Sequence, residues 1–169
     1  MASKRGRSRA QPLAVGWREW IALPDLGVEQ LKAKLDTGAA TSALHAIHIR
    51  RFSSEGLERV AFDIHPDQRT TERTVRCAAN VVDERSFTSS NGQRENRIVI
   101  QASLAIGGRC FPIEISLTNR DTMGFRMLIG RSAMKERLVV DPGRSFLAGE
   151  PSAAVTGIED ARRSPPVRY

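Results

Sequence analysis

Short apolar runs, rich in Val and Ile, alternate with polar turns between about residue 13 and residue 142. Runs of roughly four to eight such residues bounded by Gly, Pro, Asn or Asp are typical of β-strands. The pattern predicts strands over residues 15–23, 31–36, 57–64, 74–82, 97–106, 110–117, 127–129 and 138–140. Gly107-Gly108 predicts a two-residue hairpin turn, and residues 131–136 predict a helix. We therefore expect an all-β domain with one short C-terminal helix.

The tripeptide Asp36-Thr37-Gly38 directly follows one predicted strand, and the apolar run Leu128-Ile129-Gly130 precedes the predicted helix. Aspartic proteases present their catalytic carboxylate on an Asp-Thr-Gly turn, and an apolar pair followed by Gly and a short helix supports that turn. Either pattern alone also fits an ordinary protein, in which Asp36 caps a turn and residues 128–130 end a core strand. Together and in this order they predict a retropepsin-like acid-protease barrel.

Each residue type in the motif has a chemical reason. Asp36 would activate water, the Thr37 hydroxyl could fix the carboxylate by bonding a facing loop, and Gly38 allows close backbone approach. Small or apolar residues are expected to support this loop. They are Ala39, Leu128, Ile129 and Gly130.

An aspartic protease needs two carboxylates that share a proton, because like charges a few ångströms apart cannot both ionise. Here Asp25-Leu26-Gly27 lacks the hydroxyl residue, and Asp141-Pro142-Gly143 has a proline in its place. The second carboxylate is therefore expected from another copy, in a homodimer with the site on its two-fold axis. The strands over residues 17–23 and 138–140 are expected to hold the dimer, because edge strands need partners.

Several longer blocks resemble a bacterial family of small retropepsin-like proteins. The blocks are residues 16–24, 32–39, 41–46, 89–92, 117–121 and 127–131. Family members commonly carry the label "ATP-dependent zinc protease" and occur with ATP-grasp glutamate ligases. The resemblance covers about residues 15–142 and implies an aspartic peptidase fold, with an ATP-grasp ligase as a partner. This chain has Ala40 where the family usually has Arg, so a substrate or dimer contact made by that Arg is not expected here.

The zinc and ATP of that label find no support in the residues. A catalytic zinc site usually has three protein ligands and an open position for water. The chain has three histidines, His45, His48 and His65, and the first two lack the Glu of an H-E-x-x-H helix. A G-x-x-x-x-G-K-[ST] phosphate loop is also absent from the sequence. We expect neither a metal nor another cofactor.

Residues 87–95 form the best candidate for a flap that covers an extended substrate and excludes water. The tip would be Ser89-Ser90-Asn91-Gly92, since Asn-Gly favours the positive φ angles of a tight hairpin turn. An ordinary surface hairpin is the alternative reading.

Composition bounds the remaining possibilities. The chain has 169 residues and a net charge of +7, and its first ten residues include four basic and no acidic side chains. We expect a basic disordered tail over residues 1–12, a retropepsin-like domain over 13–148 and a flexible C-terminal tail over 149–169. Nucleic-acid binding is not expected, because the basic tail lacks interleaved aromatic residues.

Cys77 and Cys110 are expected to be free thiols in a reducing compartment. No apolar stretch approaches the ~20 residues that span a bilayer, and the N-terminus lacks the apolar segment of a signal peptide. The expected location is the cytoplasm.

The sequence therefore predicts a homodimeric aspartic endopeptidase that acts on extended peptides or proteins. The alternative is a peptide-binding module on the same fold, which recognises a glutamylated tail or partners an ATP-grasp glutamate ligase with little turnover. A zinc metallopeptidase, as in the family label, is the least favoured reading.

Overall fold

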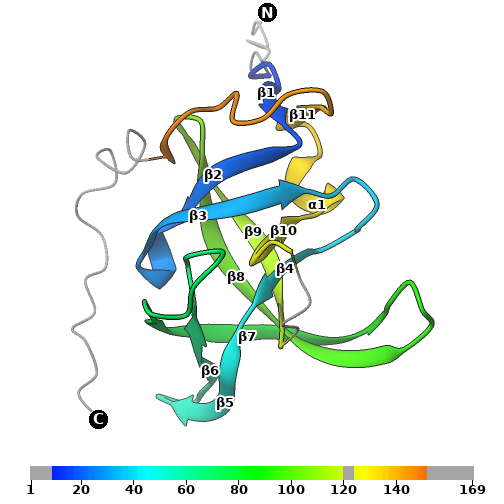
Figure 1. Ribbon diagram of the computed structural model, residues 1–169. Coiled ribbons are helices and arrows are strands. Elements are labelled where there is room, and N and C mark those ends of the chain that lie inside the picture. Colours follow the sequence, from blue (N-terminus) through cyan, green and yellow to red (C-terminus); the bar gives the residue numbers. More distant parts are fainter. Residues whose placement is uncertain (1–8, 120–123, 152–169) are drawn as a thin grey trace, which may run out of the picture.

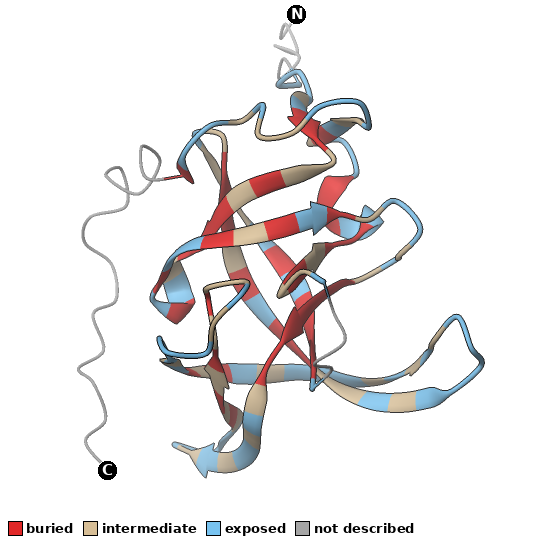
Figure 2. Ribbon diagram, in the orientation of Figure 1, coloured by how far each residue is buried: buried red, intermediate tan, exposed pale blue. Residues whose placement is uncertain are grey.

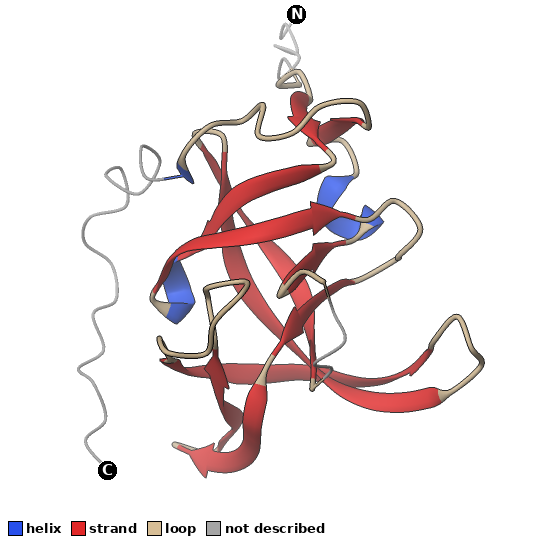
Figure 3. Cartoon of the chain, in the orientation of Figure 1, coloured by secondary structure: helices blue, strands red, loops and turns tan. Residues whose placement is uncertain are grey.

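Strands dominate the computed structural model, which describes residues 9–119 and 124–151 (Figure 3). The elements in chain order are β1 (Leu13–Gly16), β2 (Arg18–Leu23), a 3-10 turn (Pro24–Leu26), β3 (Val28–Leu35), β4 (Ser42–His45), β5 (Ile47–Ser54), β6 (Leu57–Ile64), β7 (Val75–Thr88), β8 (Arg94–Ile106), β9 (Arg109–Thr118), β10 (Met127–Ile129), α1 (Arg131–Met134) and β11 (Leu138–Asp141). The predicted all-β class with one short C-terminal helix is confirmed, and the helix is two residues shorter than expected.

Six strands close into a barrel, in the order β2-β3-β10-β4-β9-β8 (Figure 1). Ala22 of β2 pairs with Ala105 of β8 and completes the ring. Strands β7, β6 and β5 extend the sheet outward from β8. Buried positions concentrate on the barrel strands (Figure 2), and the largest fully buried side chains include Leu31, Leu104 and Met127. Aliphatic residues thus fill most of the core, as the low aromatic content of 5% requires.

Strand β10 lies between β3 and β4, two strands that come from the other end of the domain sequence. It runs parallel to β3, with Ile129 opposite Leu35, and antiparallel to β4, with Leu128 opposite Ala43. Because β3 ends at Leu35 and β4 begins at Ser42, this register places the end of β10 beside the loop that joins them.

The predicted strand over residues 15–23 is two strands in different sheets. β1 pairs in parallel with β11 in a two-stranded sheet of its own, whereas β2 has β3 on one side and β8 on the other. The chain changes direction at Trp17, whose N–H donates to the carbonyl of Arg144 at 2.9 Å. The expectation that residues 17–23 offer a free edge is therefore wrong, because β2 closes the barrel.

Two strands, β4 and β5, were not predicted from the sequence. All four residues of β4 are buried, so its pattern lacks the alternation that marks a half-exposed strand. The alternation of β5 is broken where its register with β6 shifts between Ile47 and Arg50, next to His48 with a φ of 52°. The strands of the β7–β8 hairpin are also longer than predicted, since β7 continues to Thr88 and β8 begins at Arg94.

The segment after β11 packs across β2 and is held by the carboxylate of Glu19, which is fully buried. Glu19 accepts hydrogen bonds from the N–H groups of Gly16 at 2.6 Å, Leu147 at 2.8 Å and Ala148 at 3.2 Å. Phe146 of this segment stacks on Trp20 with ring centroids 5.8 Å apart. Sequence reasoning missed Glu19, because its donors Leu147 and Ala148 lie far away along the chain.

The predicted domain limits stay a prediction, since residues 1–8 and 152–169 of the expected tails lie outside the described residues. Within the described part, the strands run from Leu13 to Asp141. None of the described helices is long and apolar enough to cross a membrane.

Candidate active site

The loop after β3 carries Asp36, and the hydrogen bonding between β3 and β10 continues into it. The Asp36 N–H donates to the carbonyl of Ile129 at 2.8 Å, so β3 and β10 remain paired up to the acidic residue. The Asp36 carboxylate accepts the N–H of Gly38 at 3.0 Å, and the Asp36 carbonyl accepts the N–H of Ala39 at 3.3 Å. These bonds hold the carboxylate in a tight turn while leaving it partly exposed.

Gly130 lies directly against the far end of this loop. A Cβ at Gly130 would come within 2.6 Å of the Thr41 carbonyl carbon and 2.9 Å of the Ser42 nitrogen, closer than real Cβ contacts. The Gly130 N–H donates to the Ser42 hydroxyl at 3.1 Å. A glycine is therefore required here for close approach of two backbone segments, not for an unusual φ angle.

The first residues of α1 close the loop from the other side. The N–H groups of Arg131 and Ser132 donate to the carbonyls of Ala39 and Ala40 at 2.8 and 3.0 Å. The Arg131 guanidinium also donates to the Thr37 carbonyl at 3.0 Å. These contacts fix the loop backbone, and Thr37 and Gly38 remain exposed at its crest, where a facing loop could reach them.

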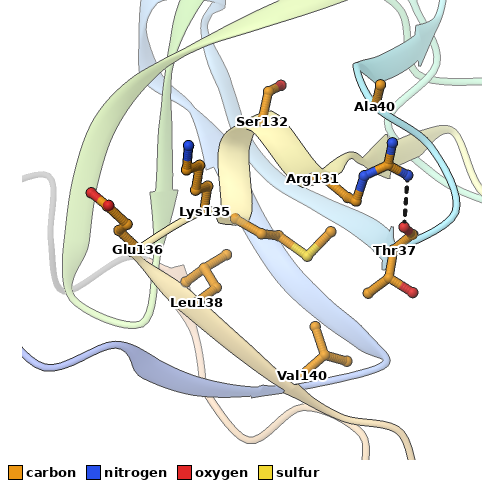
Figure 4. Close-up of a pocket in the computed structure, with 9 residues that line it drawn as sticks. Thr37, Ala40, Arg131, Ser132, Lys135, Glu136, Leu138 and Val140 are labelled. Carbon is orange, nitrogen blue, oxygen red and sulfur yellow. Dashed lines mark hydrogen bonds between the residues drawn. The ribbon is translucent and has the colours of Figure 1, made fainter.

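A hollow of about 670 Å³ adjoins the loop and extends to β11 (Figure 4). Its walls are Thr37, Ala40, Arg131, Ser132, Met134, Lys135, Glu136, Leu138 and Val140. Apolar side chains from α1 and β11 line it, with Arg131, Lys135 and Glu136 supplying charges of both signs. The hollow therefore makes one continuous surface with the candidate catalytic loop.

The structure places the candidate flap residues Ser89, Ser90, Asn91 and Gly92 in the turn of the β7–β8 hairpin. The Ser89 N–H donates to the Gln93 carbonyl at 2.8 Å, and Gly92 has a φ of 82°. This hairpin extends well beyond the barrel (Figure 1). Its shape suits a flap, and its function as a flap stays a prediction.

The histidines do not assemble a zinc site. His45 is buried in β4, His48 is exposed and contacts Asp63 at 2.8 Å, and His65 lies beside Arg73 and Thr74. Within residues 9–119 and 124–151, no group of three or more His, Cys, Asp or Glu side chains is placed to hold a metal ion. The residues present do not fit the metal that the family label names.

A second hollow, of about 390 Å³, lies on the outer face of β2 and β3. It is lined by Trp20, Gln30, Lys32, Pro66, Asp67, Gln68, Arg69, Thr70 and Arg73. Arg73 is paired with Asp67 at 3.0 Å, so Lys32 and Arg69 give the hollow an excess of positive charge.

Comparison with protein families gives a match over nearly all of the described domain. The family model described as "RimB-like: Retropepsin-like aspartic endopeptidase RimB" matches residues 14–151. The matched range includes the Asp36 loop, the β7–β8 hairpin and Gly130.

Curated relatives carry a different kind of name. A "Probable alpha-L-glutamate ligase" of Shewanella pealeana is 44% identical over 154 residues, which are 89% of this chain and 34% of the relative. A protein of the same name from Desulfotalea psychrophila is 42% identical over 143 residues, which are 85% of this chain and 31% of the relative. The chain spans about a third of the length of these relatives.

A solved structure shares the architecture. A Legionella pneumophila protein described as having unknown function superposes with a TM-score of 0.68 and 26% identity, covering 80% of this chain and 98% of that protein. The overall fold of the chain is therefore also found in an experimentally determined structure.

Proposed function

The chain belongs to the RimB-like family of retropepsin-like aspartic endopeptidases, and from this premise we propose that it is an aspartic endopeptidase that works as a homodimer. The observation that carries the proposal is the Asp36 turn. Its backbone is fixed by Ile129 and Arg131, while its carboxylate accepts an N–H of its own loop and stays partly exposed. A rigid loop that presents an accessible carboxylate is what positioned acid–base chemistry needs.

Two Asp36 side chains, one from each copy, would hold a water molecule between them. The ionised carboxylate takes a proton from the water as its oxygen attacks the peptide carbonyl, and the protonated one donates its proton to the developing oxyanion. Transfer of a proton to the amide nitrogen then breaks the C–N bond and releases an amine and a carboxylic acid. One chain supplies a single Asp-Thr-Gly, so the reaction requires two chains.

The surface around Asp36 supports pairing of two copies. Thr37 and Gly38 are exposed beside the hollow of about 670 Å³. In the described part of the chain, β11 pairs with β1 along one side, and Val139 of β11 is 57% exposed. A sheet edge and an apolar hollow next to the catalytic loop are features that a second copy would cover.

The substrate would lie extended between the Asp36 loops and the β7–β8 hairpins. An extended peptide offers main-chain hydrogen bonds to a strand beside it, and closure of the hairpins would exclude water from the reacting bond. The substrate class proposed here is therefore an unfolded segment or tail of a protein.

Mixing chains with and without the carboxylate tests this proposal. Asp36→Asn protein added in excess to wild type should suppress cleavage of an extended-peptide library, because mixed dimers pair a carboxylate with an amide. The control is Glu72→Gln, at an exposed position. Added to wild type in the same excess, it should leave cleavage undiminished. Light scattering on the same samples reports the dimer. Full activity from a strictly monomeric species would contradict the shared-site mechanism.

A peptide-binding function is the second candidate, and the basic hollow on β2 and β3 favours it. Lys32 and Arg69 could pair with carboxylates, and Trp20 adds an aromatic wall. The names of the relatives suggest glutamate-bearing tails, or a ligase that makes them, as the partner. Calorimetry with oligoglutamate, and oligolysine as control, tests this. Three results together would favour the binding module. Oligoglutamate binding survives Asp36→Asn, it is lost in the double variant Lys32→Met and Arg69→Leu, and the wild type cleaves no peptide.

A further inference from the structure

Three polar residues of β9 connect the barrel to the projecting hairpin. Glu114, Ser116 and Thr118 occupy alternate positions of the strand and therefore face the same side. Each contacts one charged side chain of the hairpin. The contacts are Arg85 to Glu114 at 2.7 Å, Arg97 to Ser116 at 3.5 Å and Glu95 to Thr118 at 3.1 Å.

The Arg97–Ser116 contact is the least exposed to water of the three, since the Glu95 side chain is 33% exposed. The side chains of Arg85 and Glu114 are 37% and 44% exposed, whereas the Arg97 side chain is 11% exposed and Ser116 is fully buried. An exposed ion pair is screened by solvent and contributes little. A buried guanidinium without its partners would be strongly unfavourable, so the position of Arg97 is tied to the groups around it.

Arg97 has three kinds of partner at this place. Its Nε lies 2.9 Å from a Glu95 carboxylate oxygen, and its guanidinium lies over the Phe87 ring at 4.9 Å from the centroid. Its Nη1 lies 3.5 Å from the Ser116 hydroxyl, at the outer limit of a hydrogen bond. The planar guanidinium thus links both strands of the hairpin to β9, which a lysine could do less well.

From Ser116 the polar contacts continue to the catalytic loop. The Ser116 hydroxyl donates to the Ser42 carbonyl at 3.1 Å, and the Ser42 hydroxyl accepts the N–H of Gly130 at 3.1 Å. Gly130 packs against the end of the Asp36 loop, as its contact with Thr41 shows. A continuous series of contacts, buried from Ser116 onward, therefore joins Arg97 to Gly130, the residue that supports the loop.

A β-bulge lies at the base of the same hairpin. Val81 is opposite Ile100 and Asp83 is opposite Val99, so Val82 is an extra residue in β7. Bulges bend a strand and interrupt its ladder. The hairpin therefore has a natural bending point close to Val99, and Arg97 and Glu95 bind β9 just beyond it.

We propose that Arg97 is a positioning residue that couples the β7–β8 hairpin to the catalytic loop. Through Glu95 and Ser116 it holds the hairpin on β9, and through Ser42 and Gly130 the same contacts reach the turn that carries Asp36. Movement of the hairpin is then transmitted to the loop. The consequence for catalysis rests on the proposed peptidase function, whereas the coupling is a property of the folded chain.

Hydrogen exchange measured by mass spectrometry tests the coupling without any substrate. Arg97→Gln should accelerate exchange about tenfold in peptides covering residues 83–98 and also in those covering residues 36–42 and 129–132. Exchange in β2 and β3, residues 18–35, should stay as in wild type. Arg85→Gln is the matched control, because Arg85 lies directly opposite Arg97 in the hairpin, and it should affect the hairpin alone.

Conservative variants separate coupling from general destabilisation. Ser116→Ala removes the hydroxyl that joins Arg97 to Ser42 while retaining a small side chain, and it should give the same pattern as Arg97→Gln. Arg97→Lys keeps the charge beside Glu95 and should restore part of the protection in residues 36–42. Faster exchange confined to the hairpin in both Arg97→Gln and Ser116→Ala, or spread uniformly over the chain, would overturn the proposal.

Peptide cleavage gives a second readout that keeps the two proposals distinguishable. If the wild type cleaves, Arg97→Gln should lower kcat by about tenfold with KM changed less, because the loop rather than substrate affinity is affected. If the wild type cleaves no peptide, the peptidase proposal fails and the exchange pattern alone decides the coupling. An unchanged kcat together with unchanged exchange at residues 36–42 would reject the coupling and leave Asp36 chemistry standing.

Discussion

Glu19 and Asp36 are two carboxylates at the ends of neighbouring strands, and the barrel uses them in opposite ways. Glu19 is fully buried, and N–H groups of Gly16, Leu147 and Ala148 donate to it. Asp36 is partly exposed and accepts the N–H of Gly38 within its own turn. A carboxylate whose oxygens are taken up by several backbone donors is a structural anchor. One that keeps access to solvent can still accept or donate a proton.

The first prediction is that substitution of Asp36 removes cleavage but not stability, whereas substitution of Glu19 does not remove cleavage. Asp36→Asn should lower peptide cleavage by roughly a thousand-fold or more, because it removes an acid–base group, and should leave the free energy of unfolding within about 0.5 kcal/mol of wild type. Glu19→Gln should retain cleavage. Urea denaturation and a peptide-cleavage assay on the same preparations measure both quantities. Substantial cleavage by Asp36→Asn would place the chemistry elsewhere.

The second prediction concerns stability at Glu19. Glu19→Ala leaves three backbone N–H groups without their acceptor, and each unsatisfied buried group costs roughly 1–3 kcal/mol. We expect unfolding to become easier by about 3 kcal/mol, measured by urea denaturation, with residues 144–148 losing protection from hydrogen exchange. Glu19→Gln keeps one acceptor oxygen and should lose about half as much. Equal stability of Glu19→Ala and wild type would show that the segment after β11 does not depend on this carboxylate.

The third prediction concerns Gly130, where the backbone packs directly against the end of the Asp36 loop. In Gly130→Ala the new methyl group meets the Thr41 backbone at 2.6 Å, so the loop or α1 must move. We expect a loss of about 1–3 kcal/mol, in the range of overpacking, together with reduced cleavage. Gly124→Ala is the control, because a Cβ there meets nothing within 4 Å. If Gly130→Ala matches Gly124→Ala in stability, the close approach is not needed.

The two carboxylates also show what sequence reasoning can reach. The Asp36 motif could be found because Thr37 and Gly38 follow it directly, so three adjacent positions mark Asp36 as a candidate catalytic residue. Glu19 and its acceptor role were missed, because its donor Leu147 is 128 residues away and no local spacing marks the pair. Arg97 was missed for the same reason, since its contact with Ser116 depends on how two long strands pair.

The strands show the same limit at the level of the fold. The β8–β9 hairpin was predicted correctly, because Gly107 and Gly108 both adopt the positive φ angles of its turn and the flanking runs are apolar. Strand β4 was missed because it is buried along its whole length, and burial on both faces removes the alternation on which the prediction depends. Local signals therefore revealed the motif and the fold class, but not the long-range contacts that hold them in place.

Cys77 is a buried ionisable group, like Glu19, and extends the comparison. Whereas Glu19 is surrounded by N–H donors, the Cys77 thiol faces carbonyl oxygens, donating to that of Leu26 at 3.4 Å. Burial, with the negative charge of Asp63 nearby, raises the pKa of Cys77 to about 12. The thiol should therefore stay protonated and unreactive in the folded protein, since the thiolate is the nucleophile.

The sign of the resulting pH dependence follows from the two states. In the unfolded chain the thiol has its ordinary pKa of about 9.0, so the folded protein holds this proton more tightly. The stabilisation is then fully present below about pH 9 and is lost progressively as the pH rises toward about 12. Urea denaturation from pH 8 to 10.5 should show a decline in stability that Cys77→Val reduces more than Cys110→Ser does, because Cys77 is the more deeply buried thiol.

The rate of thiol labelling at pH 8 is a second test of whether Cys77 stays protonated and unreactive in the folded protein. Cys110 is partly exposed and should react first, although burial also raises its pKa. Cys77 should react only as fast as the chain opens, because a pKa raised from 9.0 to about 12 lowers the thiolate fraction about a thousand-fold. Cys110→Ser isolates the slow phase for measurement. Rapid labelling of Cys77 in that variant would mean that β7 opens readily and that burial does not protect this thiol from reaction.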